Sequence, residues 1–114
     1  MVNCLFCKIV AGDIPATIVH DNDDVLVFRD LNPVAPTHVL VIPKRHIVGA
    51  DQISASDGDV LAAMYVAAKA VAEAEGIAES GYRTVFNVGP NAGQTVPHLH
   101  LHVVGGRGMS WPPG

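Results

Sequence analysis

The sequence predicts an α+β domain built on an antiparallel β-sheet. Two observations support this class: five short β-rich runs and two helical segments alternate with turn signals, and most neighbouring elements are joined by short connections. The chain has 114 residues, of which 49% are hydrophobic, which is enough for one compact domain with a real core. We therefore expect a single domain over residues 1–114.

The N-terminal third contains one short helix and three strands. The stretch LFCKIVAGDIP predicts a helix that is stopped by Gly12 and then by Pro15. Residues 16–20 and 24–30 are two β-rich runs joined by the turn-forming DNDD. Residues 37–43 form a third run between Pro36 and Pro43, and these prolines bound it because proline cannot continue a central ladder.

The longest helix is predicted to begin at Ser56, which can form a capping box with Asp59. Gly76 follows its last turn as a C-cap. Apolar residues recur inside the helix at spacings of three and four, at Val60, Met64, Ala67 and Val71. This spacing predicts a helix with one face packed on the sheet.

Two further strands are predicted at residues 82–88 and 98–104, joined by the turn-rich GPNAGQTVP. The second strand carries three histidines at alternate positions, His98, His100 and His102. In a strand they would project from one face, roughly 6 to 7 Å apart, while the apolar residues between them enter the core. The sequence therefore predicts a row of three imidazoles on one side of the sheet.

The charge balance excludes several classes of partner. Seven basic and eleven acidic residues give a net charge of −4, so the surface is not that of a general nucleic-acid binder. No apolar run approaches the roughly 20 residues of a membrane span, and the N-terminus lacks the pattern of a secretory signal. We expect no nucleic-acid or membrane partner and a cytoplasmic location.

The histidine row has three interpretations. It could be the polar face of an ordinary edge strand, although serine or lysine would serve such a face equally well. It could instead belong to a zinc site, in which Cys4 and Cys7 supply two thiolates and His46 and His98 two imidazoles. The C-x-x-C pair could also be a redox dithiol or two buried thiols without metal.

The third interpretation is nucleophilic catalysis. A neutral imidazole is a good nucleophile when its second ring nitrogen is held by an acceptor, and His100 is central in the row. The loop before it is suited to an anion, because its glycines, including Gly93, let backbone N–H groups approach, while Gln94 and Thr95 add polar donors. Together the strand and the loop favour a phosphate site.

The run HLHLHVV fits the signature of the histidine triad (HIT) superfamily, in which three histidines are separated by apolar residues. The stretch AGQTVPHLHLHVVGGRGMSWPPG resembles the branch of histidine triad nucleotide-binding (HINT) proteins, and RDLNPVAPTHVLVIPKRHI and FCKIVAGDIPA are similar to that branch at matching places. The resemblance covers nearly the whole chain. It implies a HIT-like fold and a homodimer in which the two sheets form one continuous sheet.

The resemblance also implies an activity, the hydrolysis of purine nucleoside phosphoramidates and aminoacyl adenylates. His100 would attack the α-phosphorus to form a nucleotidyl-histidine, which water resolves to release the nucleoside monophosphate. His98 would orient His100 by hydrogen bonding, and His102 would lie against the phosphate. Thr95 stands where the family usually has a serine that helps protonate the leaving amine. Catalysis would require no cofactor.

The nucleotide-binding residues carry over in the same way. Asp30 matches the carboxylate that accepts hydrogen bonds from the ribose hydroxyls, and Asn87 matches an asparagine beside the phosphate or leaving group. The expected apolar clamp around the base is Phe6, Ile9, Ile14, Leu31 and Leu40. The tail 105–114, with Trp111, would lie near the partner's active site. Relatives with the cysteine pair resemble zinc-binding members that use Cys4, Cys7, His46 and His98.

Two other functions remain open. One is a zinc-stabilised nucleotide-binding module that signals through partners with little turnover, and the other is a dinucleoside polyphosphate hydrolase. His20 and His38 match no catalytic position, so we expect them to be surface or strand residues.

Overall fold

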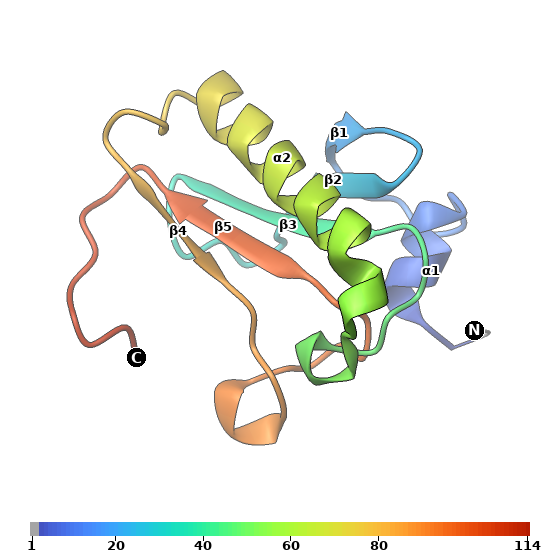
Figure 1. The fold of residues 1–114 in the computed structure, drawn as a ribbon. Helices are drawn as coiled ribbons and strands as arrows, with labels where there is room; N and C mark the ends of the chain where they lie inside the picture. Colours follow the sequence, from blue (N-terminus) through green and yellow to red (C-terminus); the bar gives the residue numbers. More distant parts are fainter. Residues whose placement is uncertain (1–2) are drawn as a thin grey trace.

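The computed structural model describes residues 3–114, and Met1 and Val2 of the expected 1–114 domain lie outside the described residues. Its centre is a five-stranded antiparallel sheet with the order β1-β2-β3-β5-β4 (Figure 1). The strands are β1 Ile18–Asp21, β2 Val25–Arg29, β3 Thr37–Pro43, β4 Tyr82–Val85 and β5 Leu101–Gly105. The α-helices are α1 Leu5–Val10 and α2 Gly58–Ala74, and the 3-10 helices are η1 Ala50–Gln52, η2 Ala55–Asp57 and η3 Pro90–Ala92. The predicted α+β class, with five antiparallel strands and two helices, is confirmed.

The two faces of the sheet bury different clusters, because successive side chains of a strand point to opposite sides. The face covered by α2 carries Val25, Val27, Val39, Val41, Leu101 and Val103 (Figure 1). The other face carries Leu26, Phe28, Leu40 and Ile42, against which Phe6 of α1 packs. All seven residues of β3, between β2 and β5, are buried, so this strand is the centre of the core.

Helix α2 begins two residues later than predicted. The carboxylate of Asp57 accepts the backbone N–H of Ser54 at 2.9 Å, so the observed capping box is Ser54–Asp57, not Ser56–Asp59, and it caps the 3-10 helix η2 that leads into α2. Asp57 is held there by Arg45, whose guanidinium donates to it at 2.6 Å. The structure places the C-cap at Glu75, and Gly76 follows it with a φ of +76°, a conformation that glycine adopts without strain, so the predicted glycine after the last turn is confirmed.

Among residues 3–114, no helix has the length and apolar character that a membrane crossing requires. The third strand was predicted to the residue, and the strands expected at 16–20, 24–30 and 82–88 are observed at 18–21, 25–29 and 82–85.

The predicted strand 98–104 is wrong at its start, since β5 begins only at Leu101. The backbone N–H of Leu99 donates to the carbonyl of Ile47 at 2.6 Å, and the ring of His98 is bonded to the carbonyl of Pro43 at 2.9 Å. Residues 98–100 are therefore held against the segment that follows β3, instead of continuing the ladder with it. This bend decides where the first histidine points.

An ion pair joins α2 to the sheet. The guanidinium of Arg29, at the end of β2, donates to both carboxylate oxygens of Glu75, at 2.7 and 3.1 Å. Glu75 is the C-cap of α2, so the pair fixes this end of the helix over β2. The hydrogen bonds from Arg29 hold the pKa of Glu75 below its ordinary value.

We expect Glu75→Gln to lower the free energy of unfolding by about 1 kcal/mol at pH 7, the upper range for a partly exposed ion pair with bidentate geometry. The carboxylate contributes this stability above the ordinary pKa of 4.5, and the contribution is lost as the pH falls through the lower pKa of the folded state. Urea denaturation at several pH values measures the effect. Glu73→Gln, an exposed change on the same helix, is the control; an equal loss in both variants would contradict a role for the Arg29 pair.

Candidate active site and metal cluster

A cavity of about 320 Å³ lies on the face of the sheet opposite α2. Its apolar walls are Leu5, Phe6, Ile9, Ile14, Pro15, Ala16, Phe28, Leu40 and Val96, with Leu31 beside them. Its polar lining includes Asp30, Asn87, Thr95, His100 and His102, with Gly93 next to them. The cavity thus combines an apolar surface with a small set of convergent polar groups, which is the usual composition of a small-molecule site.

The ring of His100 has a defined tautomer. Its Nδ1 lies 2.7 Å from the backbone carbonyl oxygen of His98, and because a carbonyl can only accept, Nδ1 carries the proton. Nε2 therefore keeps its lone pair, which is the atom a nucleophilic imidazole uses. The side chain is buried, and the ring of Phe6 packs edge-on against it with centroids 5.2 Å apart. His98 contributes to this arrangement through its backbone.

A chain of hydrogen bonds also defines His102. The backbone N–H of Val34 donates to Nδ1 of His38 at 3.1 Å, so the proton of neutral His38 is on Nε2. That Nε2 lies 2.9 Å from Nδ1 of His102 and 3.4 Å from a carboxylate oxygen of Asp30. His102 then accepts at Nδ1 and keeps Nε2–H as its remaining donor. His102 is consequently a neutral hydrogen-bond donor on the cavity wall.

The electrostatic surroundings keep His102 neutral. Burial, followed by the charges of His100 and His38, lowers the pKa of His102 to about 4, while Asp30 acts in the opposite direction. The rings of His100 and His102 lie 5.1 Å apart, so two adjacent imidazolium ions would repel each other strongly. At neutral pH His102 is therefore an uncharged hydrogen-bond donor beside the ring of His100.

His38 is a residue of this site that the sequence interpretation missed. It is 6% exposed, so the expectation of a surface residue is wrong, while that of a strand residue is correct. The available signal was alternation along the third strand, because His38 lies two residues before Leu40 and shares its face. The same alternation in the second strand indicates Phe28, which also lines the cavity.

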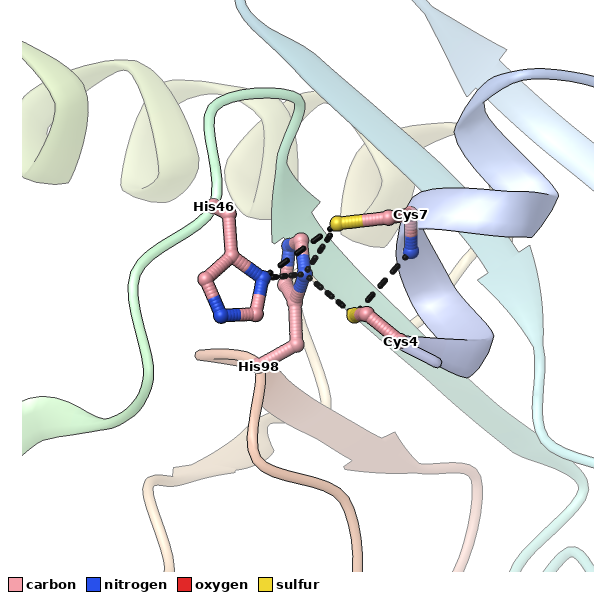
Figure 2. Close-up of side chains that lie close together, drawn as sticks. All are labelled: Cys4, Cys7, His46 and His98. Atoms are coloured by element: carbon pink, nitrogen blue, oxygen red, sulfur yellow. Dashed lines mark hydrogen bonds between the residues drawn. The ribbon is translucent and has the colours of Figure 1, made fainter. Parts of the chain in front are cut away.

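The side chain of His98 points away from the row that the sequence predicted. It is completely buried, and its Nδ1 lies 3.3 Å from the sulfur of Cys4 and 3.5 Å from that of Cys7. The prediction that all three imidazoles share one face is wrong for His98, because the bend before β5 rotates it toward α1. His98 instead belongs to a cluster with the two cysteines and His46 (Figure 2).

The cluster has the size of a tetrahedral metal site. The four donor atoms, two sulfurs and two Nδ1 nitrogens, all lie within 4.8 Å of one another. Nδ1 of His46 is 3.1 Å from Nδ1 of His98 and 3.3 Å from the sulfur of Cys7. Typical zinc bond lengths give tetrahedral edges of about 3.3 Å between two nitrogens and about 3.6 Å between nitrogen and sulfur. The observed separations therefore fit zinc.

The chemistry of the donors also fits a cation. Nε2 of His98 donates to the carbonyl of Pro43 at 2.9 Å, which leaves Nδ1 without a proton and available as a ligand. Burial and the neighbouring sulfur of Cys4 raise the pKa of Cys7, and burial lowers the pKa of His98. A thiolate pair in this position needs a compensating positive charge. The residues fit a structural zinc site with four protein ligands.

Two predicted nucleotide-binding residues lie elsewhere. The side chain of Gln94 is not among the cavity-lining residues; it bonds the backbone of Val48, Gly89 and Val96 and so braces the loop. Trp111 is 80% exposed in the single chain and is not part of the cavity lining.

Comparison with known proteins identifies the family. Residues 11–109 match the family described as HIT domain. The chain therefore belongs to the histidine triad superfamily, in agreement with the signature in its sequence.

The most informative relatives place the chain in the HINT-like branch. It is 46% identical to the 14 kDa zinc-binding protein of Zea mays, over 96% of this chain and 87% of the relative. It is 45% identical to adenylylsulfatase HINT1 of Arabidopsis thaliana, over 96% of this chain and 76% of the relative. The solved structure of a HIT family hydrolase from Legionella pneumophila matches with a TM-score of 0.96 and 54% identity, over 98% of this chain and all of that one.

We expect Cys7→Ser to weaken zinc binding by more than about 100-fold, because loss of an outer hydrogen-bonding partner alone costs 10- to 100-fold. Metal analysis of the purified protein and competition with a chromophoric chelator measure this change. Thermal unfolding should show a lower midpoint in the same variant, since a structural metal contributes to folding. His20→Gln removes a histidine outside the cluster and serves as the control; equal zinc content in both variants would exclude the proposed ligand set.

We expect His102 to make the folded state sensitive to acid. Below its ordinary pKa of 6.5 the unfolded chain binds a proton that the folded chain does not bind until about pH 4. Stability is therefore complete above pH 6.5 and declines as the pH falls, by on the order of 3 kcal/mol at pH 4. Denaturation of wild type and His102→Asn between pH 7 and 4 measures the contribution as a difference in slope. Parallel slopes would show that folding does not shift the pKa of His102.

Proposed function

We propose that this protein hydrolyses purine nucleoside phosphoramidates and aminoacyl adenylates and releases the nucleoside monophosphate. The observation that carries this proposal is the state of His100. Its Nδ1–H is held by the carbonyl of His98 at 2.7 Å, so Nε2 presents a lone pair at the wall of a cavity that also contains the neutral donor His102.

The reaction has two displacements at phosphorus. Nε2 of His100 attacks the α-phosphorus, a nitrogen–phosphorus bond forms, and the bond to the leaving group breaks as that group takes a proton. Water then attacks phosphorus and expels Nε2, and the proton that the water gives up replaces the one taken by the leaving group, so the imidazole is regenerated. Such transfers depend mainly on alignment and on stabilising charge at the non-bridging oxygens, a role suited to Nε2–H of His102.

The leaving amine must be protonated as its bond to phosphorus breaks. Thr95 and Asn87 line the same cavity as the two histidines and are the polar side chains assigned to this end of the substrate. Gly93 has a φ of +84° and turns the loop beside them. A backbone with this geometry leaves room for a phosphate to approach.

The nucleoside would occupy the apolar part of the cavity. Phe6, Ile9, Ile14, Leu31 and Leu40 supply the surface assigned to the base. Asp30 has one carboxylate oxygen bonded to the N–H of Asn32 at 2.8 Å and keeps acceptor capacity for the ribose hydroxyls. The volume of about 320 Å³ lies at the lower end of the usual range for small-molecule sites, as expected for a mononucleotide.

The relatives support a nucleotide hydrolase with a zinc site. The Legionella structure is described as a hydrolase, and the Arabidopsis relative is named an adenylylsulfatase, which places an adenylyl group in its substrate. The maize relative is named a zinc-binding protein. In this chain Cys4, Cys7, His46 and His98 would hold the zinc as a closed structural site, and Nε2 of His100 would act without a metal.

We also propose that the protein is a homodimer with a continuous sheet. Strand β4 is an edge strand, and the exposed apolar side chains near it or on α2 are Tyr82 at its start, Val88 beyond its end, and Tyr65 and Val66 of α2. Pairing between two edge strands would bury these apolar groups and satisfy the free backbone donors. The exposed Trp111 would then be available to the partner's active site.

We expect His100→Asn to reduce kcat for adenosine 5′-phosphoramidate by roughly 10³-fold or more, because the nucleophile is lost. Binding of adenosine 5′-monophosphate, measured by calorimetry, should persist. His20→Asn is the matched control and should retain wild-type turnover. Wild-type rates in His100→Asn would refute the proposed nucleophile. If the wild type cleaves only a dinucleoside polyphosphate, its substrates are dinucleoside polyphosphates and not phosphoramidates. If zinc-loaded wild type binds nucleotide without any turnover, the binding-module alternative is favoured.

A further inference from the structure

Three segments that are distant in sequence meet at the Cys/His cluster, and two of them also reach the cavity or His100. Cys4 is the N-cap of α1 and Cys7 lies within it, His46 follows β3, and His98 precedes β5 (Figure 2). His98 and Phe6 connect the cluster to the cavity. The question is what the cluster does to the cavity when it binds a metal.

The first connection runs through His98. Its side chain faces the cluster through Nδ1, its Nε2 is bonded to Pro43, and its own carbonyl oxygen holds Nδ1–H of His100. The next residue, Leu99, donates its N–H to the carbonyl of Ile47, immediately after His46. The carbonyl that sets the tautomer of His100 is therefore anchored from both sides by residues 43–47. Movement of His98 or His46 would shift that carbonyl.

The second connection runs through Phe6. Its backbone lies between the two cysteines of α1, and Cys4 accepts the N–H of Cys7 at 3.3 Å, which closes the first turn around it. The ring of Phe6 packs edge-on against His98 at 5.9 Å, against His100 at 5.2 Å and against Phe28 at 5.3 Å. Phe6 is 5% exposed and lines the cavity. It joins the cysteines, both histidines and the surface assigned to the base.

We propose that the Cys/His cluster is a positioning device for the nucleotide site, so that a metal at Cys4, Cys7, His46 and His98 and a nucleoside monophosphate in the cavity bind cooperatively. The metal takes no part in the chemistry. It fixes the carbonyl of His98, and through it His100, together with the ring of Phe6. The assignment of the cavity to a nucleotide rests on the proposed function, whereas the coupling itself is a property of binding.

Cooperativity of this kind is reciprocal. If the metal raises the affinity for nucleotide by a factor, the nucleotide must raise the affinity for metal by the same factor, and allosteric couplings are typically about 5- to 150-fold. Two sites that share buried, closely packed side chains fall within this range because packed interiors transmit small shifts instead of absorbing them. Zinc should therefore bind more tightly when the cavity is filled.

The test measures transfer of zinc from the protein to a chromophoric chelator, with and without saturating adenosine 5′-monophosphate. We expect the nucleotide to lower the zinc dissociation constant at least 5-fold, and zinc to lower the nucleotide dissociation constant by the same factor. Equal zinc affinity in both conditions would overturn the coupling and leave the hydrolase proposal intact. Coupling in a protein that turns over no substrate would refute the hydrolase and support the positioning device.

A second measurement requires no metal-free protein. Cobalt(II) replaces zinc and reports its ligand geometry through its visible d–d bands, so these bands should change when adenosine 5′-monophosphate binds to the cobalt-loaded chain. Unchanged bands at saturation would contradict the proposal. This result separates a specific connection from simple unfolding of the metal-free protein.

Two variants of the cavity wall locate the connection. Phe6→Leu keeps α1 apolar but removes the ring that contacts His98 and His100, whereas Leu31→Ala changes a wall residue that is 94% exposed and remote from the cluster. Both should weaken nucleotide binding. Only Phe6→Leu should reduce the coupling factor, at least severalfold. An equal reduction in both variants, or in neither, would exclude Phe6 as the connecting residue.

Discussion

The hydrogen bond from Nδ1 of His100 to the carbonyl of His98 is the interaction on which the site depends. It places the lone pair on Nε2, and it requires the backbone carbonyl of His98 to keep a fixed position. The bend that provides this carbonyl also sends the His98 side chain to the cysteines. One local departure from strand geometry therefore sets the tautomer of His100 and also supplies the fourth donor of the Cys/His cluster.

Neutrality is the second constraint on the cavity. His100 and His102 lie 5.1 Å apart in a buried wall, where two positive charges would be expensive. The hydrogen bonds from the Val34 amide to His38 and from His38 to His102 avoid this cost. They fix the tautomer of His102 so that its Nε2–H can donate while the ring stays uncharged. An anionic substrate would then face oriented dipoles and not mobile charges. Such dipoles need no rearrangement during the reaction.

Much of this arrangement could be predicted from local pattern. A β-rich run with prolines at its ends predicted β3 to the residue, and the triad signature with its preceding loop indicated a site at His100. Pattern could not reveal that His98 leaves the strand, because the cause is a long-range hydrogen bond between Leu99 and Ile47. Alternation with Leu40 could have placed His38 on the cavity face, but its bond to His102, 64 positions away, could not be read from local pattern. The helix start was misplaced because two Ser–Asp spacings overlap, and the one that forms, Ser54–Asp57, caps the 3-10 helix η2 that precedes α2.

The cluster joins residues at the two extremes of the sequence, with Cys4 and His98 separated by 94 positions. A ribosome must synthesise the chain through His98 and β5 before these donors can meet. The emerging chain can form its first hairpin and pack Phe6 of α1 against Phe28 early, but the wall that carries His100 and His102 is missing until β5 emerges. Chains shortened to end before His98 would consequently lack both the fourth donor of the Cys/His cluster and the histidine wall of the cavity.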